Sequence, residues 1–467
     1  MRVPKYDEFV QIYVVVYFYG MTNVYLYKIV LGGVRKHLVC LSLIVSGCLG
    51  AKAQNYISYF TGDTTDVESI PTAGTVLMGG ATENDNAMRW FLERAGGGDV
   101  VVLRTTGDDG YNDYFYSDLG VIVNSVETII CNDAASGADP YVIHQVENAE
   151  ALWFAGGDQW DYIQYWRNTP LEDVFNVLIN DKKIPIGGTS AGCAIQGEAY
   201  FSAENGTITS TQALHDPYHN LMTLGYSDFI DNPGTKQIIT DTHYDNPDRR
   251  GRHIAFLARL YQETGVPYYG IGVEEYTAVC IDENNIAHVF GSYPYYDDYA
   301  YFLQVNCVEP NTPETCVDGS LLTWDRSSAA VKVIKMAGMD FGEGSVDLND
   351  WKTAVGADFQ WEDWSVDNAI FSALEMTSPI NCDTLLTVEN NILKNVVIYP
   401  NPATDHISLQ NTGSDFDYRI LNISGDCIFK GTMNSNDQIN VRDIPAGLYV
   451  IEIRSDNYLD YQSFLKH

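Results

Sequence analysis

The sequence predicts an α/β protein with a doubly wound, mostly parallel sheet, followed by a small C-terminal β-sandwich. Two observations support this fold class. Between residues 54 and 375, short apolar runs alternate with segments of helical periodicity, as expected for strands buried on both faces and covered by helices. From about residue 393 the chain changes to short alternating strands separated by turn residues, which is typical of a small sandwich.

The elements of the α/β part follow from local patterns. A helix is predicted over 82–94, where apolar residues share one face and a run of glycines follows. A second helix is predicted from Asn246-Pro247 up to Gly265. The predicted strands are 75–78, 100–103, 121–123, 151–154, 184–186 and 238–239. In such sheets ligands bind at the carboxyl ends of the strands, so the loops at those ends hold the candidate site.

The N-terminal 53 residues have the pattern of a secretory signal peptide. A basic stretch at 35–37 precedes an apolar run at 38–50 and an Ala-Lys-Ala site, which predicts cleavage after Ala53. The apolar run is too short to span a membrane, and the stretch before it is interpreted as sequence upstream of the true start. The alternative is a lipobox that would leave Cys48 lipidated.

The charge balance excludes several partners. The 467 residues contain 62 acidic and 27 basic side chains, for a net charge of −35. Removing residues 1–53 takes away six basic and two acidic side chains and leaves a net charge of −39. Nucleic acids and anionic membranes both require basic surfaces, so neither is an expected ligand. The acidic excess favours solubility in an exported protein.

The cysteines give little sign of metal binding. Seven cysteines follow Ala53, and the odd number prevents complete pairing within one chain. Cys307 and Cys316 flank a polar, Pro-containing loop and are the expected disulfide of an exported protein. Neither C-x-x-C nor H-E-x-x-H occurs, so no metal and no cofactor are expected.

The strongest chemical signal is Gly-Thr-Ser-Ala-Gly at residues 188–192, directly after the apolar run 184–186. The pattern G-x-S-x-G describes a nucleophile elbow, where small neighbours permit a tight turn that exposes the serine hydroxyl. Ser190 is therefore the candidate nucleophile. The backbone N–H of Ala191 is the first candidate oxyanion donor.

Three further loops supply candidate partners for Ser190. Gly-Gly-Asp-Gln at 156–159 offers the N–H of Gly157 as a second oxyanion donor and the amide of Gln159 for substrate positioning. His243, at the end of the run 238–239, is the candidate base. Asp241, two residues before His243, would point the same way as His243 in an extended strand and is grouped with the candidate substrate-binding residues. The triad acid is Glu275 in the first interpretation and Glu198 in the alternative.

In chain order, the four motifs are Gly-Gly-Asp-Gln at 156–159, Gly-Thr-Ser-Ala-Gly at 188–192, Asp-Thr-His-Tyr at 241–244 and Gly-Ile-Gly-Val-Glu-Glu at 270–275. Together they resemble the cyanophycinase and aspartyl dipeptidase (peptidase E) family of serine peptidases over residues 54–300. The resemblance implies a flavodoxin-like fold similar to class I glutamine amidotransferases. It also implies a Ser–His–acid attack on peptides that contain aspartyl residues. The resemblance also implies that arginines bind a carboxylate of the substrate, and the corresponding segment of this chain holds Arg249, Arg250 and Arg252.

The chain departs from the family pattern in three places, which leaves the substrate open. Tyr244 stands where the family has phenylalanine, residues 203–236 lengthen the path from nucleophile to base, and an extension runs from 292 to 330.

The C-terminal segment 393–467 carries a second resemblance. Its Tyr-Pro-Asn-Pro-Ala opening at 399–403 and its Gly-Leu-Tyr-Val-Ile-Glu-Ile close at 447–453 resemble the sorting domain of the Bacteroidota type IX secretion system. This implies export across the outer membrane, contact with the secretion machinery, and a secreted or cell-surface location. The predicted domains are thus a leader (1–53), a peptidase domain (54–375), a linker (376–392) and the sorting domain.

The leading functional prediction is an exported serine peptidase that hydrolyses cyanophycin-like or β-aspartyl peptides, with a peptide or polyamide as substrate. A hydrolase that uses Cys193, three residues past the serine, is a weaker alternative because a buried thiol is the ordinary role of such a cysteine. A non-catalytic surface binding protein, which would use some of the 32 tyrosines, is the alternative from another class. A homodimer is one of the assemblies compatible with these predictions.

Overall fold

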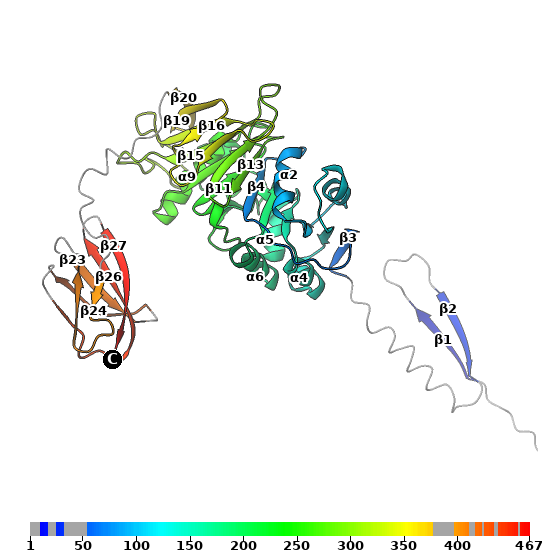
Figure 1. Ribbon diagram of the computed structural model, residues 1–467, viewed down its shortest axis with the longest axis horizontal. Coiled ribbons are helices and arrows are strands. Elements are labelled where there is room, and N and C mark those ends of the chain that lie inside the picture. Colours follow the sequence, from blue (N-terminus) through cyan, green and yellow to red (C-terminus); the bar gives the residue numbers. More distant parts are fainter. Residues whose placement is uncertain are drawn as a thin grey trace, which may run out of the picture.

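The computed structural model describes residues 10–16, 25–31, 54–376, 397–410, 416–422, 425–433, 438–455 and 458–467 (Figure 1). Near the N-terminus, β1 (Val10–Val16) and β2 (Tyr25–Leu31) pair antiparallel. The predicted basic and apolar parts of the leader, its cleavage site and Cys48 lie outside the described residues. The predicted linker also lies outside them, apart from Met376 at the end of a strand.

A ten-stranded sheet forms the centre of the α/β part, with the order β18-β17-β14-β13-β4-β8-β7-β5-β6-β3. The five strands from β4 to β6 in this order are parallel, and the strands on either side are antiparallel. The strands are β3 (Tyr56–Gly62), β4 (Gly74–Met78), β5 (Asp99–Arg104), β6 (Ser125–Cys131), β7 (Ala151–Phe154), β8 (Pro185–Thr189), β13 (Ala278–Asp282), β14 (Ile286–Phe290), β17 (Gly344–Asp347) and β18 (Ala354–Val355).

Helices cover both faces of the parallel strands because successive strand residues point to opposite sides. Val100 and Val102 of β5 pack with α2 (Asp85–Arg94), whereas Val101 and Leu103 pack with the opposite layer. That layer contains α4 (Pro140–Glu147), α5 (Gln159–Trp166) and α6 (Pro170–Val177). The α/β class and the helices on both faces are therefore as predicted.

A second, eight-stranded sheet was not expected, and the prediction of one mostly parallel sheet is corrected accordingly. Its order is β10-β9-β11-β12-β15-β16-β19-β20, and only β11 pairs in parallel, with β9 and with β12. Its strands are β9 (Ala199–Phe201), β10 (Leu224–Tyr226), β11 (Ile238–Asp241), β12 (Tyr269–Val273), β15 (Tyr299–Val305), β16 (Val331–Ala337), β19 (Phe359–Asp367) and β20 (Ile370–Met376). Short turns between consecutive strands, such as residues 368–369 between β19 and β20, force antiparallel pairing.

The two sheets share an apolar layer. Leu77 of β4 and Val279 of β13, in the ten-stranded sheet, pack in one buried cluster with Ile271 of β12 and Ile334 of β16. The other face of the eight-stranded sheet is covered by α9 (Arg250–Thr264) and α8 (Ser210–His215). The short helices α3 (Gly110–Asp113) and α7 (Ala191–Ala194) complete the α-helices of the described residues.

The C-terminal strands pair among themselves around one buried cluster. A three-stranded sheet contains β21 (Val397–Tyr399), β22 (His406–Gln410) and β25 (Ile439–Asn440). A four-stranded sheet contains β23 (Phe416–Leu421), β24 (Cys427–Met433), β26 (Gly447–Ser455) and β27 (Tyr458–Lys466).

Three local predictions are wrong. Residues 121–123 form no strand, because Asn124 bonds back to the Gly98 carbonyl and β6 starts only at Ser125. Helix α9 starts at Arg250 rather than at Asn246, because a turn bridges residues 245 and 248. Cys307 is disulfide-bonded, whereas Cys316 is a free and buried thiol, so these two do not pair.

Within the described residues, no helix combines the length and the apolar character that crossing a membrane would require.

Candidate active site

Ser190 lies on the sharp turn between β8 and α7, at the carboxyl edge of the parallel strands. Its backbone is strained, with φ +53° and ψ −112°. The neighbouring glycines are required sterically: a Cβ at Gly192 would lie 2.0 Å from the Phe154 carbonyl oxygen, and one at Gly188 would lie 2.6 Å from the backbone of Gly192. The Ser190 N–H donates to the Met78 carbonyl at 3.0 Å, which holds the turn against β4.

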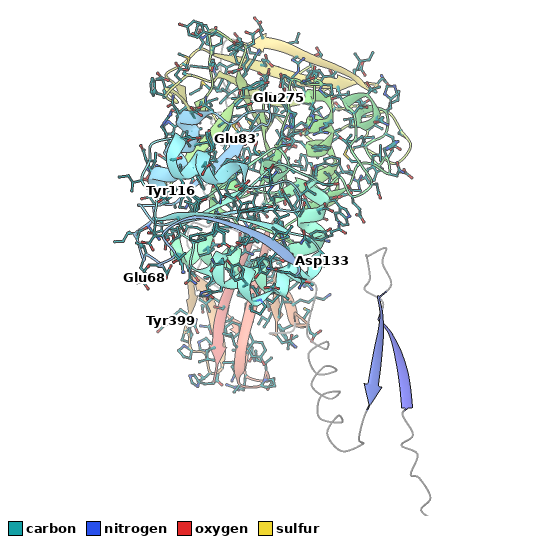
Figure 2. All side chains as sticks on the ribbon, turned by 90° about the vertical axis from the view of Figure 1, so that its right-hand side faces the viewer. Glu68, Glu83, Tyr116, Asp133, Glu275 and Tyr399 are labelled. Carbon is teal, nitrogen blue, oxygen red and sulfur yellow. The ribbon has the colours of Figure 1, made fainter. Side chains whose placement is uncertain are left out.

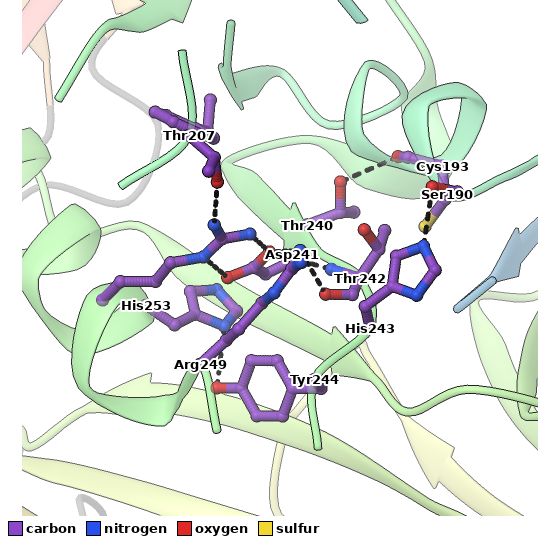
Figure 3. A network of polar contacts seen from close by, with 12 residues as sticks. Ser190, Cys193, Thr207, Thr240, Asp241, Thr242, His243, Tyr244, Arg249 and His253 are labelled. Atoms are coloured by element: carbon purple, nitrogen blue, oxygen red, sulfur yellow. Dashed lines mark hydrogen bonds and ion pairs between the residues drawn. The ribbon is translucent and has the colours of Figure 1, made fainter. Parts of the chain in front are cut away.

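His243, two residues after β11, connects Ser190 to a carboxylate. Its Nε2 lies 2.8 Å from the Ser190 hydroxyl oxygen, and its Nδ1 lies 2.6 Å from Oε1 of Glu275. Figure 3 shows the contact between Ser190 and His243. The hydrogen bond from His243 holds the pKa of Glu275 below its ordinary value. These distances allow a proton to pass from the hydroxyl to the imidazole, with the carboxylate stabilising the cation.

Glu275, and not Glu198, is the carboxylate bonded to His243. The Glu275 side chain also lies 3.5 Å from the amide nitrogen of Asn246, and its backbone N–H donates to Asp245 at 3.0 Å. Glu198 instead accepts from the Ser227 hydroxyl at 2.7 Å and from the Gln237 N–H at 2.7 Å.

A loop that sequence reasoning missed, Gly79-Gly80 after β4, positions both partners of Ser190. The Gly79 carbonyl accepts a hydrogen bond from the backbone N–H of His243 at 2.8 Å. The Gly80 carbonyl accepts one from the backbone N–H of Tyr276, the residue after Glu275, at 3.1 Å. Gly80 has φ +120°, and a Cβ there would lie 2.4 Å from the His243 ring. Two glycines directly after an apolar strand were the available signal. The position of Glu275 can be followed in Figure 2, which also labels Glu83, three residues after Gly80.

The predicted oxyanion donors lie near Ser190. Ala191 is the first residue of α7, where a backbone N–H has no partner within the helix. A Cβ on Gly156 would lie 3.7 Å from the Ser190 Cβ, so the peptide that joins Gly156 to Gly157 passes close to the serine. Gln159 begins α5, and its amide lies 3.4 Å from the Phe201 carbonyl.

Asp241, labelled in Figure 3, forms a buried ion pair with Arg252 beside the site. The Arg252 guanidinium donates to both Asp241 oxygens, at 2.8 and 2.5 Å, and burial leaves only 4% of each side chain exposed. The cation holds the pKa of Asp241 below its ordinary value, although burial acts in the opposite direction. Both groups thus have their charges satisfied within the protein.

The other two arginines differ in their partners. Arg250 makes two hydrogen bonds to the Asp248 carboxylate, at 3.0 and 2.7 Å. Arg249 donates to the Thr242 carbonyl at 2.9 Å, and its contact with Asp241 is longer, at 3.9 Å. Because a guanidinium has five N–H donors, Arg249 keeps the most unused capacity of the three.

Two other titratable groups near the site are buried. Burial raises the pKa of the Cys193 thiol, which packs in the layer between the sheets. Burial also raises the pKa of Glu274 to about 7, although Tyr301 and the Tyr299 N–H both donate to its carboxylate. Among the described residues, no group of three or more His, Cys, Asp or Glu side chains is arranged to hold a metal ion.

Comparison with known proteins assigns two segments. Residues 105–289 match the model of peptidase family S51, and residues 397–466 match the secretion system C-terminal sorting domain. The cyanophycinase of Geminocystis herdmanii is 24% identical over 230 residues, covering 47% of this chain and 78% of that protein. The cyanophycinase of Synechococcus elongatus is 25% identical over 239 residues, covering 49% and 68%.

Among solved structures, a peptidase from an acI-B1 Actinobacterium aligns with 14% identity and a TM-score of 0.36, covering 48% of this chain and 90% of that one. A putative peptidase E from Listeria monocytogenes aligns with 16% identity and a TM-score of 0.27, covering 47% and 97%.

The sequence matches agree with the predicted family resemblance and with the predicted sorting domain. The chain is a peptidase similar to family S51, and it carries a secretion-system C-terminal sorting domain that supports export.

Proposed function

We propose that this protein is an exported serine peptidase that hydrolyses cyanophycin-like or β-aspartyl peptides through Ser190, His243 and Glu275. The observation that carries the proposal is the continuous hydrogen-bonded path from the Ser190 hydroxyl through the His243 ring to Glu275. The strained backbone of Ser190 supports it, since strain of this kind is concentrated at functional sites. The substrate class comes from the cyanophycinases to which the chain is similar.

In the proposed reaction, His243 Nε2 takes the Ser190 proton as the hydroxyl oxygen attacks the scissile carbonyl. Glu275 stabilises the imidazolium that forms. The N–H groups of Ala191 and Gly157 stabilise the oxyanion. The imidazolium then protonates the leaving amine, and water releases the acyl group by the same steps in reverse.

Arg249 is our first choice for a substrate carboxylate because its guanidinium has the most unused donors. Arg250 and Arg252 already bind Asp248 and Asp241, so we assign them, with Asp241, to the support of the site. Gln159, at the start of α5, is proposed to position the substrate amide. We further propose a flavodoxin-like core, a C-terminal β-sandwich, and a signal peptide that directs the first step of export.

The test is release of β-Asp-Arg from insoluble cyanophycin, together with labelling by a fluorophosphonate probe. Wild type should do both, and Ser190→Ala should do neither. Glu275→Gln should slow both reactions by at least about 100-fold, while the matched change Glu198→Gln should leave them unaffected. Activity retained in Ser190→Ala would refute the nucleophile, and an inert wild type would favour a binding protein.

A further inference from the structure

Two neighbouring loops outside the S51-matched segment expose aromatic and acidic side chains. Tyr295 is 84% exposed, Tyr296 70% and Phe341 72%. The acidic residues Asp297, Asp340 and Glu343 are exposed on the same two loops. We call these six residues the aromatic rim. Isolated exposed apolar side chains are ordinary, but three on adjacent loops suggest a binding surface.

The backbones of the two loops are bonded to each other. The Tyr293 N–H donates to the Gly338 carbonyl at 3.0 Å, and the Gly338 N–H donates to the Asp298 carbonyl at 2.8 Å. Within the first loop, the Asp298 carboxylate accepts from the Ser292 N–H at 2.7 Å. The rim is therefore built on cross-connected backbone, which reduces the entropy lost when a ligand binds.

Both loops are joined to elements of the candidate active site. Glu274, next to the proposed acid Glu275, exchanges hydrogen bonds with Tyr299 at the end of the first loop, at 2.8 and 3.2 Å. The amide of Asn86, in the first turn of α2, donates to the Asp340 carbonyl at 2.6 Å in the second loop. Helix α2 follows the Gly79-Gly80 loop that lies against His243. The rim loops are thus bonded to segments that neighbour Glu275 and His243 in the chain.

The chemistry of the rim fits cationic side chains. Aromatic faces attract guanidinium and ammonium groups, and neighbouring carboxylates strengthen that attraction. The protein shows this contact beside the rim, where the Lys335 ammonium lies 3.9 Å from the centre of the Tyr299 ring.

We propose that the aromatic rim is a second subsite, which binds arginine or lysine side chains of a polypeptide substrate at a distance from the scissile bond. The inference rests on the proposed peptidase function. It predicts that the rim contributes to the binding of long cationic substrates and contributes nothing to the binding of dipeptides.

Binding to poly-L-arginine tests the rim without requiring turnover. Three proteins are compared in the Ser190→Ala background: the parent, the rim variant Tyr295→Ser/Tyr296→Ser/Phe341→Ser, and the control Ile70→Ser/Ile122→Ser. The control residues are 92% and 87% exposed and lie outside the rim loops. All three proteins keep every charged side chain, so the general attraction of an acidic protein for a polycation is the same in each.

We expect the rim variant to bind poly-L-arginine at least about tenfold more weakly than the parent, and the control to match the parent. Equal binding by the parent and the rim variant would overturn the proposal, as would an equal loss in the control. In the active protein, the rim variant should raise KM for cyanophycin and leave turnover of a β-aspartyl dipeptide unchanged. Since binding is measured on an inactive serine variant, an error in the proposed substrate leaves this result interpretable.

Discussion

Gly80→Ala is the change that most directly tests how the His243 ring is held. The added Cβ would lie 2.4 Å from Cε1, 2.5 Å from Nε2 and 2.9 Å from Nδ1 of that ring. Ordinary van der Waals contact begins near 3.4 Å. The ring must therefore move by about 1 Å to relieve the closest contact.

A movement of this size is large compared with the hydrogen bonds of the site. The Ser190 and Glu275 contacts of His243 are 2.8 and 2.6 Å long. A displacement of about 1 Å along either contact takes it beyond hydrogen-bonding distance, and a displacement of the same size across the contact tilts the hydrogen bond by about 20°. Misplacement by 1 Å can cost about 100-fold in rate, and a general base contributes about 10²- to 10⁴-fold. We expect kcat/KM to fall by about 10²- to 10³-fold, which corresponds to about 3–4 kcal/mol in the activation barrier.

The assay is the second-order rate of fluorophosphonate labelling, supported by cyanophycin hydrolysis. Gly206→Ala is the matched control, because Gly206 has a similar φ of +102° but its nearest neighbour lies 3.9 Å from the added Cβ. Both variants carry the cost of a positive φ, about 1–3 kcal/mol, and thermal unfolding measures it. A folded Gly80→Ala protein that labels as fast as Gly206→Ala would refute this account of the site.

Three further predictions concern stability and reactivity. Arg252→Met leaves the Asp241 carboxylate buried without its cation, so the free energy of unfolding in urea should fall by about 3–5 kcal/mol. Arg442→Met, in an exposed pair, should leave the free energy of unfolding nearly unchanged. The Glu274 carboxyl, with a pKa of about 7 when folded and 4.5 ordinarily, costs stability as the pH rises between these values. Relative to wild type, Glu274→Gln should therefore gain about 3 kcal/mol in unfolding free energy between pH 4.5 and 7.5. If the difference in unfolding free energy between variant and wild type did not change with pH, this prediction would be contradicted. Of the described free cysteines only Cys427 is exposed, so iodoacetamide should modify it in the folded protein and leave the buried ones unmodified until urea is added.

The sequence predicts four of the five parallel strands of the larger sheet, β4, β5, β7 and β8, because strands buried on both faces form continuous apolar runs. It misses β6, whose apolar run is interrupted by Glu127 and Thr128. It does not predict the second sheet, whose outer strands mix buried and exposed residues. In β20, for instance, no residue is fully buried, and the pattern resembles a surface extension. Whether such a strand joins a sheet depends on partners far along the chain, which a local pattern cannot show.

The candidate site, like the fold, could be predicted from the sequence only in part. Ser190 and His243 were identifiable because each follows an apolar run, and the structure brings them to hydrogen-bonding distance. The choice between Glu275 and Glu198 could not be made locally. It depends on the parallel register of β11 and β12, which pairs Asp241 with Gly272 and so carries residues just past both strands to the same place. Arg252 was predicted near a substrate carboxylate, and the structure shows it bound to Asp241 instead.

The three residues of the hydrogen-bonded path do not belong to one sheet. Ser190 follows β8 of the ten-stranded sheet, and His243 follows β11 of the eight-stranded sheet. Glu275 lies in the connection from β12 to β13, where the chain passes from one sheet to the other. The alignment of the path therefore depends on how the sheets are spaced. Apolar residues such as Ile271 and Val279 fill the layer between the sheets. We therefore expect substitutions in this layer to change the rate at Ser190 through sheet spacing, while every site residue stays the same.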